Sequence, residues 1–233
     1  PYTNRNIGVW ARPLANWLVS WPTGGVGVYD KLTYTPFTRM ASLSSSIARL
    51  TLTVGSVGKH FYATGWRVGF LIGPEDLVAC VRKAHTRVCF VSPSILQEAA
   101  AVGYEVAEKR GFWAQSIEQM AEKMKRFCEV WDELGIPYSV PDGGYFVVAN
   151  MKKVKLPESY VYPAHISGRP RDFKLAWFLI NELGIGAIPP SEFFTDSNAH
   201  IMEDWLRFAV CRTDERLELA KERLRGLKKY IEE

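Results

Sequence analysis

The sequence predicts an α/β protein in which strands and helices alternate through both halves of the chain. Short runs of β-branched and other apolar residues, such as Leu50–Val54 and Arg67–Ile72, are typical of buried strands. The segment 117–134 instead carries apolar residues at three- and four-residue spacing, which is typical of one face of an amphipathic helix. Because the two patterns alternate along the chain, they indicate helices packed on sheets.

The composition indicates a globular protein and excludes several classes. The 233 residues, 47% of them hydrophobic, can bury the core of one large or two small domains. The net charge is +4, and the basic run Lys221–Lys229 is interleaved with Glu222 and leucines. We interpret this run as a solvated helix face, so no nucleic-acid partner is expected. No apolar run reaches transmembrane length, and no membrane partner is expected either.

Cysteine and histidine usage argues against a metal site. The four cysteines have no Cys-x-x-Cys spacing and the four histidines are scattered singly. Neither metal ligation nor a disulfide framework is therefore expected, and a reducing compartment fits this pattern. The first residues lack an initiating methionine, a long apolar region and a clear cleavage site, so they are a poor signal peptide.

The first half of the chain is expected to run from strand to loop to strand and then through two helices. Proline at the start of the first helix and acidic residues in its first turn favour that assignment. The expected elements are strand Leu50–Val54, strand Arg67–Ile72, a helix from Pro74 to about His85, a loop from His85 to Phe90, and a helix from Pro93 to about Lys109 that Gly111 interrupts.

The second half is expected to begin with a long helix that ends at Gly135 in a left-handed cap. A hairpin, a long polar loop, two more strands and two helices follow. The expected elements are strands Tyr138–Val140 and Tyr145–Ala149, the loop Met151–Arg171, helix Asp172–Leu183 with a cap at Gly184, strands Ile185–Ile188 and Trp205–Val210, and helix Asp214–Ile231.

The stretch that carries chemistry is Ser56–Gly69, and it is expected to form a loop between two strands. Lys59 and Arg67 stand eight residues apart, and the glycines of the loop let the chain double back, so both side chains are expected to face one small site. Arg67 offers a planar fork for a phosphate, and the Ser56 hydroxyl adds a donor. A lysine near fixed positive charge loses its proton more easily, which imine formation with an aldehyde requires. The residues therefore suggest a phosphorylated aldehyde cofactor.

This stretch has two alternative interpretations. A nucleotide-binding P-loop requires glycine four residues before its Gly-Lys pair and Ser or Thr after it, but Thr53 and His60 occupy those positions. An ordinary glycine-rich connection with a solvated lysine is the simpler alternative for a bare Gly-Lys pair. The longer pattern of serine, glycine and lysine followed by Gly-x-Arg-x-Gly favours the cofactor.

The run SVGKHFYATGWRVG resembles the pyridoxal-phosphate lysine signature of fold type I, class I and II aminotransferases. With GGYFVV, LGIGAIPPSEFF and LRFAV, the chain from about Val28 onward is similar to the kynurenine aminotransferases of eukaryotes, the fungal ones especially. The resemblance implies an α/β fold, the C-terminal part of a fold type I transferase with the mixed sheet of a large domain and a small α/β C-terminal domain. The implied domains are a partial cofactor-binding domain, 1–111, in which 1–27 are of uncertain homology, and a linking helix with the small domain, 112–233.

The resemblance also implies roles for individual residues. Lys59 is the implied catalytic residue, and Tyr29, Ser56, Lys59 and Arg67 are the implied binding residues for pyridoxal 5′-phosphate. Arg207 matches the arginine that grips the α-carboxylate of the amino acid. Arg207 also stands in an otherwise apolar strand, where a guanidinium needs a partner, and a structural carboxylate is the alternative partner.

Two departures from the family qualify these expectations. Tyr62 stands where the family usually has a small residue, and it is expected to crowd the cofactor loop. Gly25-Val26-Gly27 stand where the family has Ser-Asp-Glu, and Val26 cannot pair with the pyridinium nitrogen. The chain is therefore expected to be a truncated C-terminal half that binds the cofactor weakly.

The function that the resemblance implies is transamination of an aromatic amino acid, with kynurenine as donor and 2-oxoglutarate or another 2-oxo acid as acceptor. This places the chain in tryptophan catabolism as a homodimer, in the cytosol or alternatively the mitochondrion. Tyr145 and Phe193 are candidates for an aryl pocket, with a core position as the alternative for both. Two alternative functions stay open: a truncated, non-catalytic aminotransferase fragment, and cysteine-S-conjugate β-lyase activity.

Overall fold

The computed structural model describes residues 39–139 and 143–231. The predictions for Tyr29, Val26 and the rest of 1–38 lie outside the described residues. The described residues form two compact units, 39–118 with 143–144, and 119–139 with 145–231. The division falls inside the helix Phe112–Leu134, and the domain assignment from the sequence stays a prediction.

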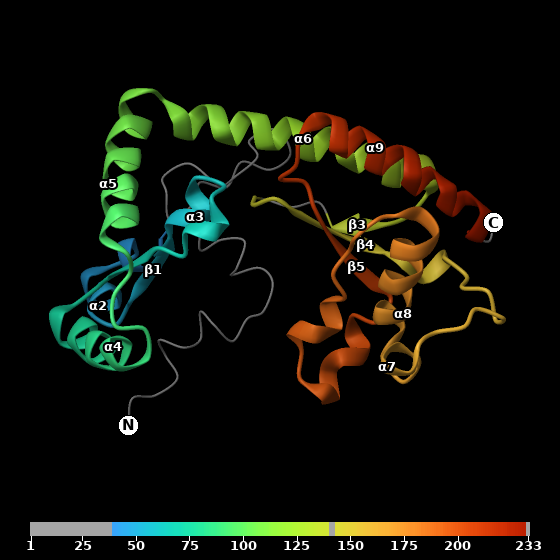
Figure 1. Ribbon diagram of the computed structural model, residues 1–233, viewed down its shortest axis with the longest axis horizontal. Helices are drawn as coiled ribbons and strands as arrows, with labels where there is room; N and C mark the ends of the chain where they lie inside the picture. The colour runs from blue at the N-terminus through green and yellow to red at the C-terminus, as the bar shows by residue number, and fades with distance from the viewer. Residues whose placement is uncertain (1–38, 140–142, 232–233) are drawn as a thin grey trace. The chain divides into compact units, whose positions relative to one another are not determined.

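The first unit contains a short antiparallel hairpin, short helical turns and two long helices (Figure 1). Thr53 pairs with Ile72 and Ser56 pairs with Gly69, so the hairpin closes on the stretch that carries the lysine. In chain order the elements are the 3₁₀ turn Met40–Ser42, α2 (Ser45–Ala48), β1 (Thr53–Ser56), α3 (Val57–His60), the 3₁₀ turn Thr64–Trp66, β2 (Gly69–Ile72), α4 (Glu75–Val88) and α5 (Ser94–Lys109).

Three boundaries in this unit differ from the prediction. The strand expected from Arg67 begins only at Gly69. The strand expected at Leu50–Val54 begins only at Thr53, because the amides of Leu50 and Thr51 bond back to the carbonyls of α2. The loop expected from His85 is helical as far as Val88, and the basic side chains of His85 and Arg87 lie in the last turn, where the helix dipole favours positive charge. Helix α5 is confirmed where it was expected.

The core of the first unit lies between the hairpin and α5. Val57, Val68 and Ala100 are buried, and five larger apolar side chains pack around them: Phe61, Trp66, Phe70, Leu96 and Tyr104.

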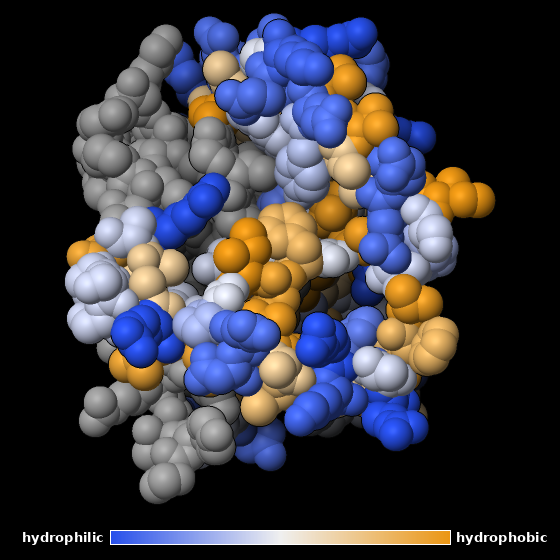
Figure 2. Space-filling model, turned by 90° about the vertical axis from the view of Figure 1, so that its left-hand side faces the viewer, coloured by the Kyte–Doolittle hydropathy of each residue, from blue (hydrophilic) through white to orange (hydrophobic). Residues whose placement is uncertain are grey.

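Some apolar side chains of this unit lie outside the core. Val88, Phe90 and Ile95 are 82%, 75% and 83% exposed. Figure 2 shows apolar side chains gathered among polar ones on the face that it presents.

The second unit packs helices on a three-stranded antiparallel sheet of order β3-β4-β5 (Figure 1). Val148 of β4 lies opposite Arg207 of β5. The elements are α6 (Phe112–Leu134), β3 (Tyr138–Ser139), β4 (Phe146–Asn150), the 3₁₀ turn Met151–Lys153, α7 (Ala164–Ser167), α8 (Arg171–Phe178) with a π-helical turn Leu179–Leu183, the 3₁₀ turns Pro190–Phe193 and Asp196–Ile201, β5 (Trp205–Ala209), α9 (Asp214–Leu224) and the 3₁₀ turns Arg225–Tyr230.

One face of this sheet is buried and the other is half-buried. Leu206 and Phe208 of β5 are buried, and the Phe208 ring lies 4.8 Å from the fully buried Trp131 of α6. Arg207 points to the opposite face because successive side chains of a strand alternate. One face of the sheet therefore lies in the apolar core, and the other face carries Arg207, the candidate substrate-binding residue.

Several predicted features of this unit are corrected. Ile185–Ile188 is not a strand: only Ile188 pairs with Arg207, and the two prolines that follow it have no amide to extend the ladder. The run Lys221–Lys229 is not wholly a solvated face, because Lys221 is buried with its Nζ 2.8 Å from Glu129 and Arg225 bonds Glu133.

The glycine breaks predicted from the sequence are confirmed. Gly111, Gly135 and Gly184 have φ angles of +63°, +60° and +66°, a region in which a side chain is strained. Each follows a helical segment and ends it. Within the described residues no helix is both long and apolar enough to span a bilayer, and no group of three potential metal ligands occurs.

Removal of the central core side chain should destabilise the second unit strongly. Trp131→Ala is expected to cost about 3–5 kcal/mol in the free energy of unfolding, because a large fully buried side chain leaves a cavity. Val161→Ala, at a side chain that is 87% exposed, is the matched control and should change it by less than about 0.5 kcal/mol. Urea unfolding of both variants provides the comparison, and equal losses would contradict the core assignment.

Candidate active site

The turn that carries Lys59 is a short helix and not the open loop that the sequence predicted. Ser56 ends β1, and α3 begins at the next residue, so the half-buried Lys59 lies in the single turn of that helix. The amide of Val57 donates to the carbonyl of Val68 over 3.0 Å. This bond and the pairing of Ser56 with Gly69 close the neck of the segment that follows.

Gly58 explains how the segment doubles back. A side chain at Gly58 would lie 2.7 Å from the carbonyl oxygen of Ala63 and 2.9 Å from the Cα of Thr64, so the backbone returns directly over this residue. Gly65 differs, because a side chain there would meet nothing within 4 Å. The expected role of glycine in the turn is therefore supported at Gly58.

Arg67 directly follows the 3₁₀ turn Thr64–Trp66 and precedes β2. Its backbone adopts a left-handed conformation with φ 55°, which is uncommon for a residue other than glycine. Its exposed guanidinium donates to the Thr64 carbonyl over 3.2 Å, the only hydrogen bond that it makes within the described part of the chain. The closed neck thus brings Ser56, Lys59 and Arg67 onto one compact segment, whereas Tyr29 is outside the described residues.

An aromatic cluster that the sequence analysis did not identify supports the lysine turn. His60 is buried, and its Nδ1 bonds the hydroxyl of Tyr104 from α5. The rings of Phe70 and Trp113 lie 6.0 and 6.4 Å from the imidazole. Burial lowers the pKa of His60 from 6.5 to about 4, and Arg39 adds to this effect. His60 is therefore neutral near pH 7 and acts as a packing anchor for α3.

Tyr62 also fixes the segment. Its backbone is left-handed with φ 55°, and its hydroxyl lies 2.6 Å from the hydroxyl of Ser116, a buried residue of α6. The ring that was expected to crowd the loop therefore ties this loop to the first part of α6.

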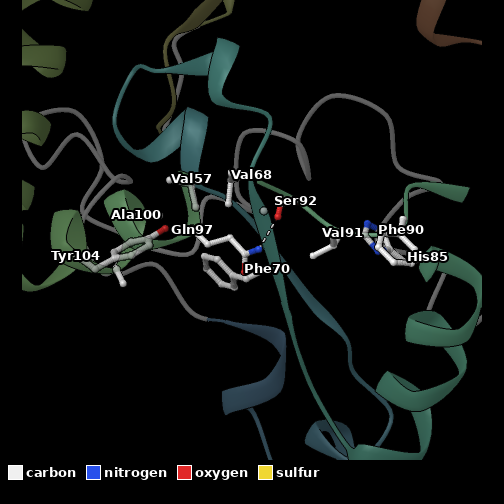
Figure 3. A pocket seen from close by; sticks show the side chains of 12 residues that line it. Val57, Val68, Phe70, His85, Phe90, Val91, Ser92, Gln97, Ala100 and Tyr104 are labelled. Atoms are coloured by element: carbon white, nitrogen blue, oxygen red, sulfur yellow. Dashed lines mark hydrogen bonds between the residues drawn. The ribbon is translucent and has the colours of Figure 1, made fainter. Parts of the chain in front are cut away.

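A cavity of about 400 Å³ lies beside the lysine turn (Figure 3). Val57, Val68 and Tyr104 contribute to its wall, and the Gln97 amide donates to the Ser92 carbonyl over 2.7 Å inside it. Ser56, Lys59 and Arg67 are not among its lining residues. This cavity adjoins the candidate site but is distinct from it.

Arg207 forms a second candidate site, within the second unit. It lies in the middle of β5, and its backbone amide and carbonyl both bond Ile188 at 3.0 Å. The guanidinium carbon lies 4.1 Å from the centre of the Phe146 ring and 4.7 Å from that of Phe193. Such contacts stabilise a cation without a counter-charge.

The polar environment of Arg207 leaves room for an anion. Its Nε is buried and has no hydrogen-bond partner among the described residues. Burial lowers the pKa of Arg207, while Tyr145 and Glu192 act in the opposite direction. Among these same residues no carboxylate forms an ion pair or a hydrogen bond with the guanidinium, so the carboxylate partner considered from the sequence is reduced to the electrostatic effect of Glu192. A carboxylate ligand would satisfy this buried donor.

Comparison with known proteins identifies the pattern. Residues 25–224 match the family described as aminotransferase class I and II. The chain is 48% identical over 206 residues to the probable kynurenine–oxoglutarate transaminase BNA3 of Saccharomyces cerevisiae, and 31% identical over 194 residues to the kynurenine–oxoglutarate transaminase of Dictyostelium discoideum. The crystal structure of Bna3p from Saccharomyces cerevisiae superimposes with a TM-score of 0.81.

The matches cover most of this chain but only part of each relative. They span 88% and 82% of this chain, and 46% and 44% of the two transaminases. The structural match covers 88% of this chain and 49% of Bna3p. The chain thus spans about half the length of the curated relatives that it matches.

The role of Gly58 predicts a sharp difference between two glycines of the lysine segment. Gly58→Ala should distort the turn and destabilise it by about 1–3 kcal/mol, as overpacking does. Gly65→Ala, the matched control, has open space and should leave the turn intact or stabilise it slightly. Hydrogen exchange of peptides that cover 53–72 measures this, and equal protection in both variants would contradict the close approach at Gly58.

The buried neutral His60 should make stability depend on pH. Between pH 6.5 and about 4 the unfolded chain binds a proton on this imidazole that the folded chain does not, so stability falls as the pH is lowered through this range. The slope from this one group is at most about 1.4 kcal/mol per pH unit. His60→Phe should lack that component in urea unfolding across the same range. Parallel pH profiles for the parent and the variant would show that the imidazole is not held neutral.

Proposed function

Because the chain belongs to the class I and II aminotransferase family, we propose that it supplies the lysine, phosphate and carboxylate contacts of a pyridoxal-phosphate-dependent aminotransferase. Members of this family depend on that cofactor, which is a phosphorylated aldehyde. One observation carries the proposal: Lys59 lies in a rigid turn whose neck is closed beside Ser56 and Arg67.

The chemistry of these residues fits the cofactor. The Ser56 hydroxyl and the Arg67 guanidinium are donors suited to a phosphate, and the exposed guanidinium keeps donors beyond the one that bonds Thr64. The Lys59 amine is suited to an aldehyde carbon. Tyr29, by resemblance, would donate to the phenolic oxygen of the cofactor ring.

The proposed reaction assigns each residue a separate task. When bound, the cofactor supplies a ring that withdraws electrons from the substrate Cα. Lys59 would hold the cofactor through its aldehyde carbon, and the Lys59 amine would accept and return the proton of the substrate Cα. Arg207 binds the substrate carboxylate through paired N–H donors and so fixes the direction of the Cα–H bond.

We propose kynurenine and a 2-oxo acid as the substrates. Support comes from two relatives named kynurenine–oxoglutarate transaminases, at 48% and 31% identity. The Phe193 ring beside Arg207 offers an aromatic surface next to the proposed carboxylate site. The homodimer, the place in tryptophan catabolism and the cytosolic or mitochondrial compartment rest on the same resemblance.

Lys59→Ala should abolish covalent capture of pyridoxal 5′-phosphate and leave the fold intact, because the half-buried amine contributes little to the core. Borohydride reduction followed by peptide mapping locates the label in the parent chain. Lys83→Ala, at an exposed position of α4, is the control and should retain full labelling. A label on any lysine other than Lys59 would contradict the assignment of Lys59 as the lysine that binds the cofactor.

Arg207→Ala should impair amino-acid turnover far more than cofactor capture. Loss of a charge-assisted hydrogen bond to the carboxylate is expected to reduce transition-state stabilisation by about 2 kcal/mol or more, as calculated from the ratio of kcat/KM between the parent and the variant. Kynurenine turnover and reductive labelling of Lys59 are measured on the same preparation. If both fell equally, Arg207 would have a structural role instead.

A further inference from the structure

The segment that follows Ile188 wraps around Arg207 from backbone to side chain. Ile188 exchanges two backbone hydrogen bonds with Arg207, and the chain then forms the 3₁₀ turn Pro190–Phe193. This turn ends with the Phe193 ring against the guanidinium of the same arginine. One short segment therefore contacts both ends of Arg207.

A buried carboxylate anchors that segment. Asp172 is fully buried at the start of α8, and its two oxygens accept from the amide of Ser191 at 2.8 Å, the hydroxyl of Ser191 at 2.9 Å and the amide of Phe173 at 3.0 Å. Three donors compensate for the burial of this charge. Because Ser191 lies two residues before Phe193 in the same turn, Asp172 fixes the position from which the Phe193 ring extends.

The sheet supplies the other ring. Phe146 lies on β4, two positions from Val148, which pairs directly with Arg207. Residues at this diagonal share one face of the sheet and are within reach of long side chains. The Phe146 ring also packs 4.3 Å from that of Tyr145, which is buried, so this contact comes from a rigid element.

We infer that Phe146 and Phe193 are positioning residues that hold Arg207 for a substrate carboxylate, and that Asp172 keeps Phe193 in place. The inference rests on the proposed role of Arg207. A guanidinium is planar, stacks well on aromatic rings and directs its N–H donors within its plane. Rings against the guanidinium reduce its rotamer freedom and its contact with water, while the in-plane donors stay available to an anion. The buried Nε without a partner among the described residues is one such donor.

The chemical reactivity of Arg207 tests the arrangement without any cofactor. Phenylglyoxal modifies accessible guanidinium groups, and peptide mapping gives a rate for each arginine. Phe193→Leu and Phe146→Leu should each raise the rate at Arg207 by roughly fivefold, the loss expected for one partly desolvated cation–π contact. The rate at the exposed Arg67 serves as the internal standard. Asp172→Asn should raise the rate at Arg207 in the same direction, because it weakens the bonds that hold Ser191.

Binding of 3-phenylpropionate, a simple aromatic carboxylate, is the second arm. Calorimetric titration of the full chain should give a dissociation constant roughly fivefold weaker in the two leucine variants, in line with that same contact. Phe173→Leu is the matched control, since its ring lies 3.8 Å from the guanidinium carbon of Arg169 and is not one of the two rings against Arg207. It should leave both the Arg207 rate and the dissociation constant at the parent values.

The outcomes distinguish the aromatic positioning of Arg207 from its proposed carboxylate binding. Loss of binding in Arg207→Ala, together with parent-like reactivity and affinity in both leucine variants, would overturn the aromatic positioning and keep the proposed carboxylate role. Unchanged binding in Arg207→Ala would overturn the carboxylate role itself. Recovery of the parent rate in Phe193→Tyr, which restores a ring, is expected if the ring positions Arg207.

Discussion

The candidate active site depends on one steric constraint, the close approach of Gly58 to the backbone of Ala63 and Thr64. Only a residue without a side chain leaves room for a carbonyl oxygen that would lie 2.7 Å from a Cβ. The return of the chain at this point allows β2 to pair with β1 and closes the segment between Ser56 and Arg67. The lysine turn is also fixed by the packing of the buried His60 against aromatic rings. Its geometry therefore does not depend on the polar groups to which the proposed chemistry is assigned.

The second unit holds a half-buried cation, the guanidinium of Arg207, on one face of its sheet. The guanidinium of Arg207 contacts two aromatic rings, and the charge of Glu192 adds a favourable electrostatic effect without forming an ion pair with it in the described part of the chain. A carboxylate would neutralise the arginine and compete with a ligand, whereas the rings stabilise it and leave its in-plane donors available. The residues proposed to bind the cofactor thus lie in the first unit, and the arginine proposed to bind the substrate carboxylate lies in the second.

The sequence predicted the features that depend on local chemistry. Helix α5, the long helix α6 and the breaks at Gly111 and Gly135 follow from periodicity and backbone preference, and they are confirmed. Two predictions in the second unit failed. Only Ile188 of the expected strand Ile185–Ile188 pairs with Arg207, since the prolines that follow have no amide to extend the ladder, and Lys221 is buried because Glu129 of another helix pairs with it. Sequence patterns likewise predicted roles for Lys59 and Arg207. No local pattern indicates the contact of His60 with Tyr104, 44 residues away, or that of Asp172 with Ser191.

We propose that the lysine turn of the first unit, with Ser56 and Arg67 beside Lys59, holds the phosphorylated cofactor. A crystal structure of the protein with the stable reduced conjugate of pyridoxal phosphate and kynurenine is the measurement that tests this proposal. We expect the phosphate of the conjugate to contact Ser56 and Arg67, and its pyridoxal carbon to lie beside the Lys59 amine. A conjugate whose phosphate is bound away from Ser56 and Arg67 would contradict the proposal.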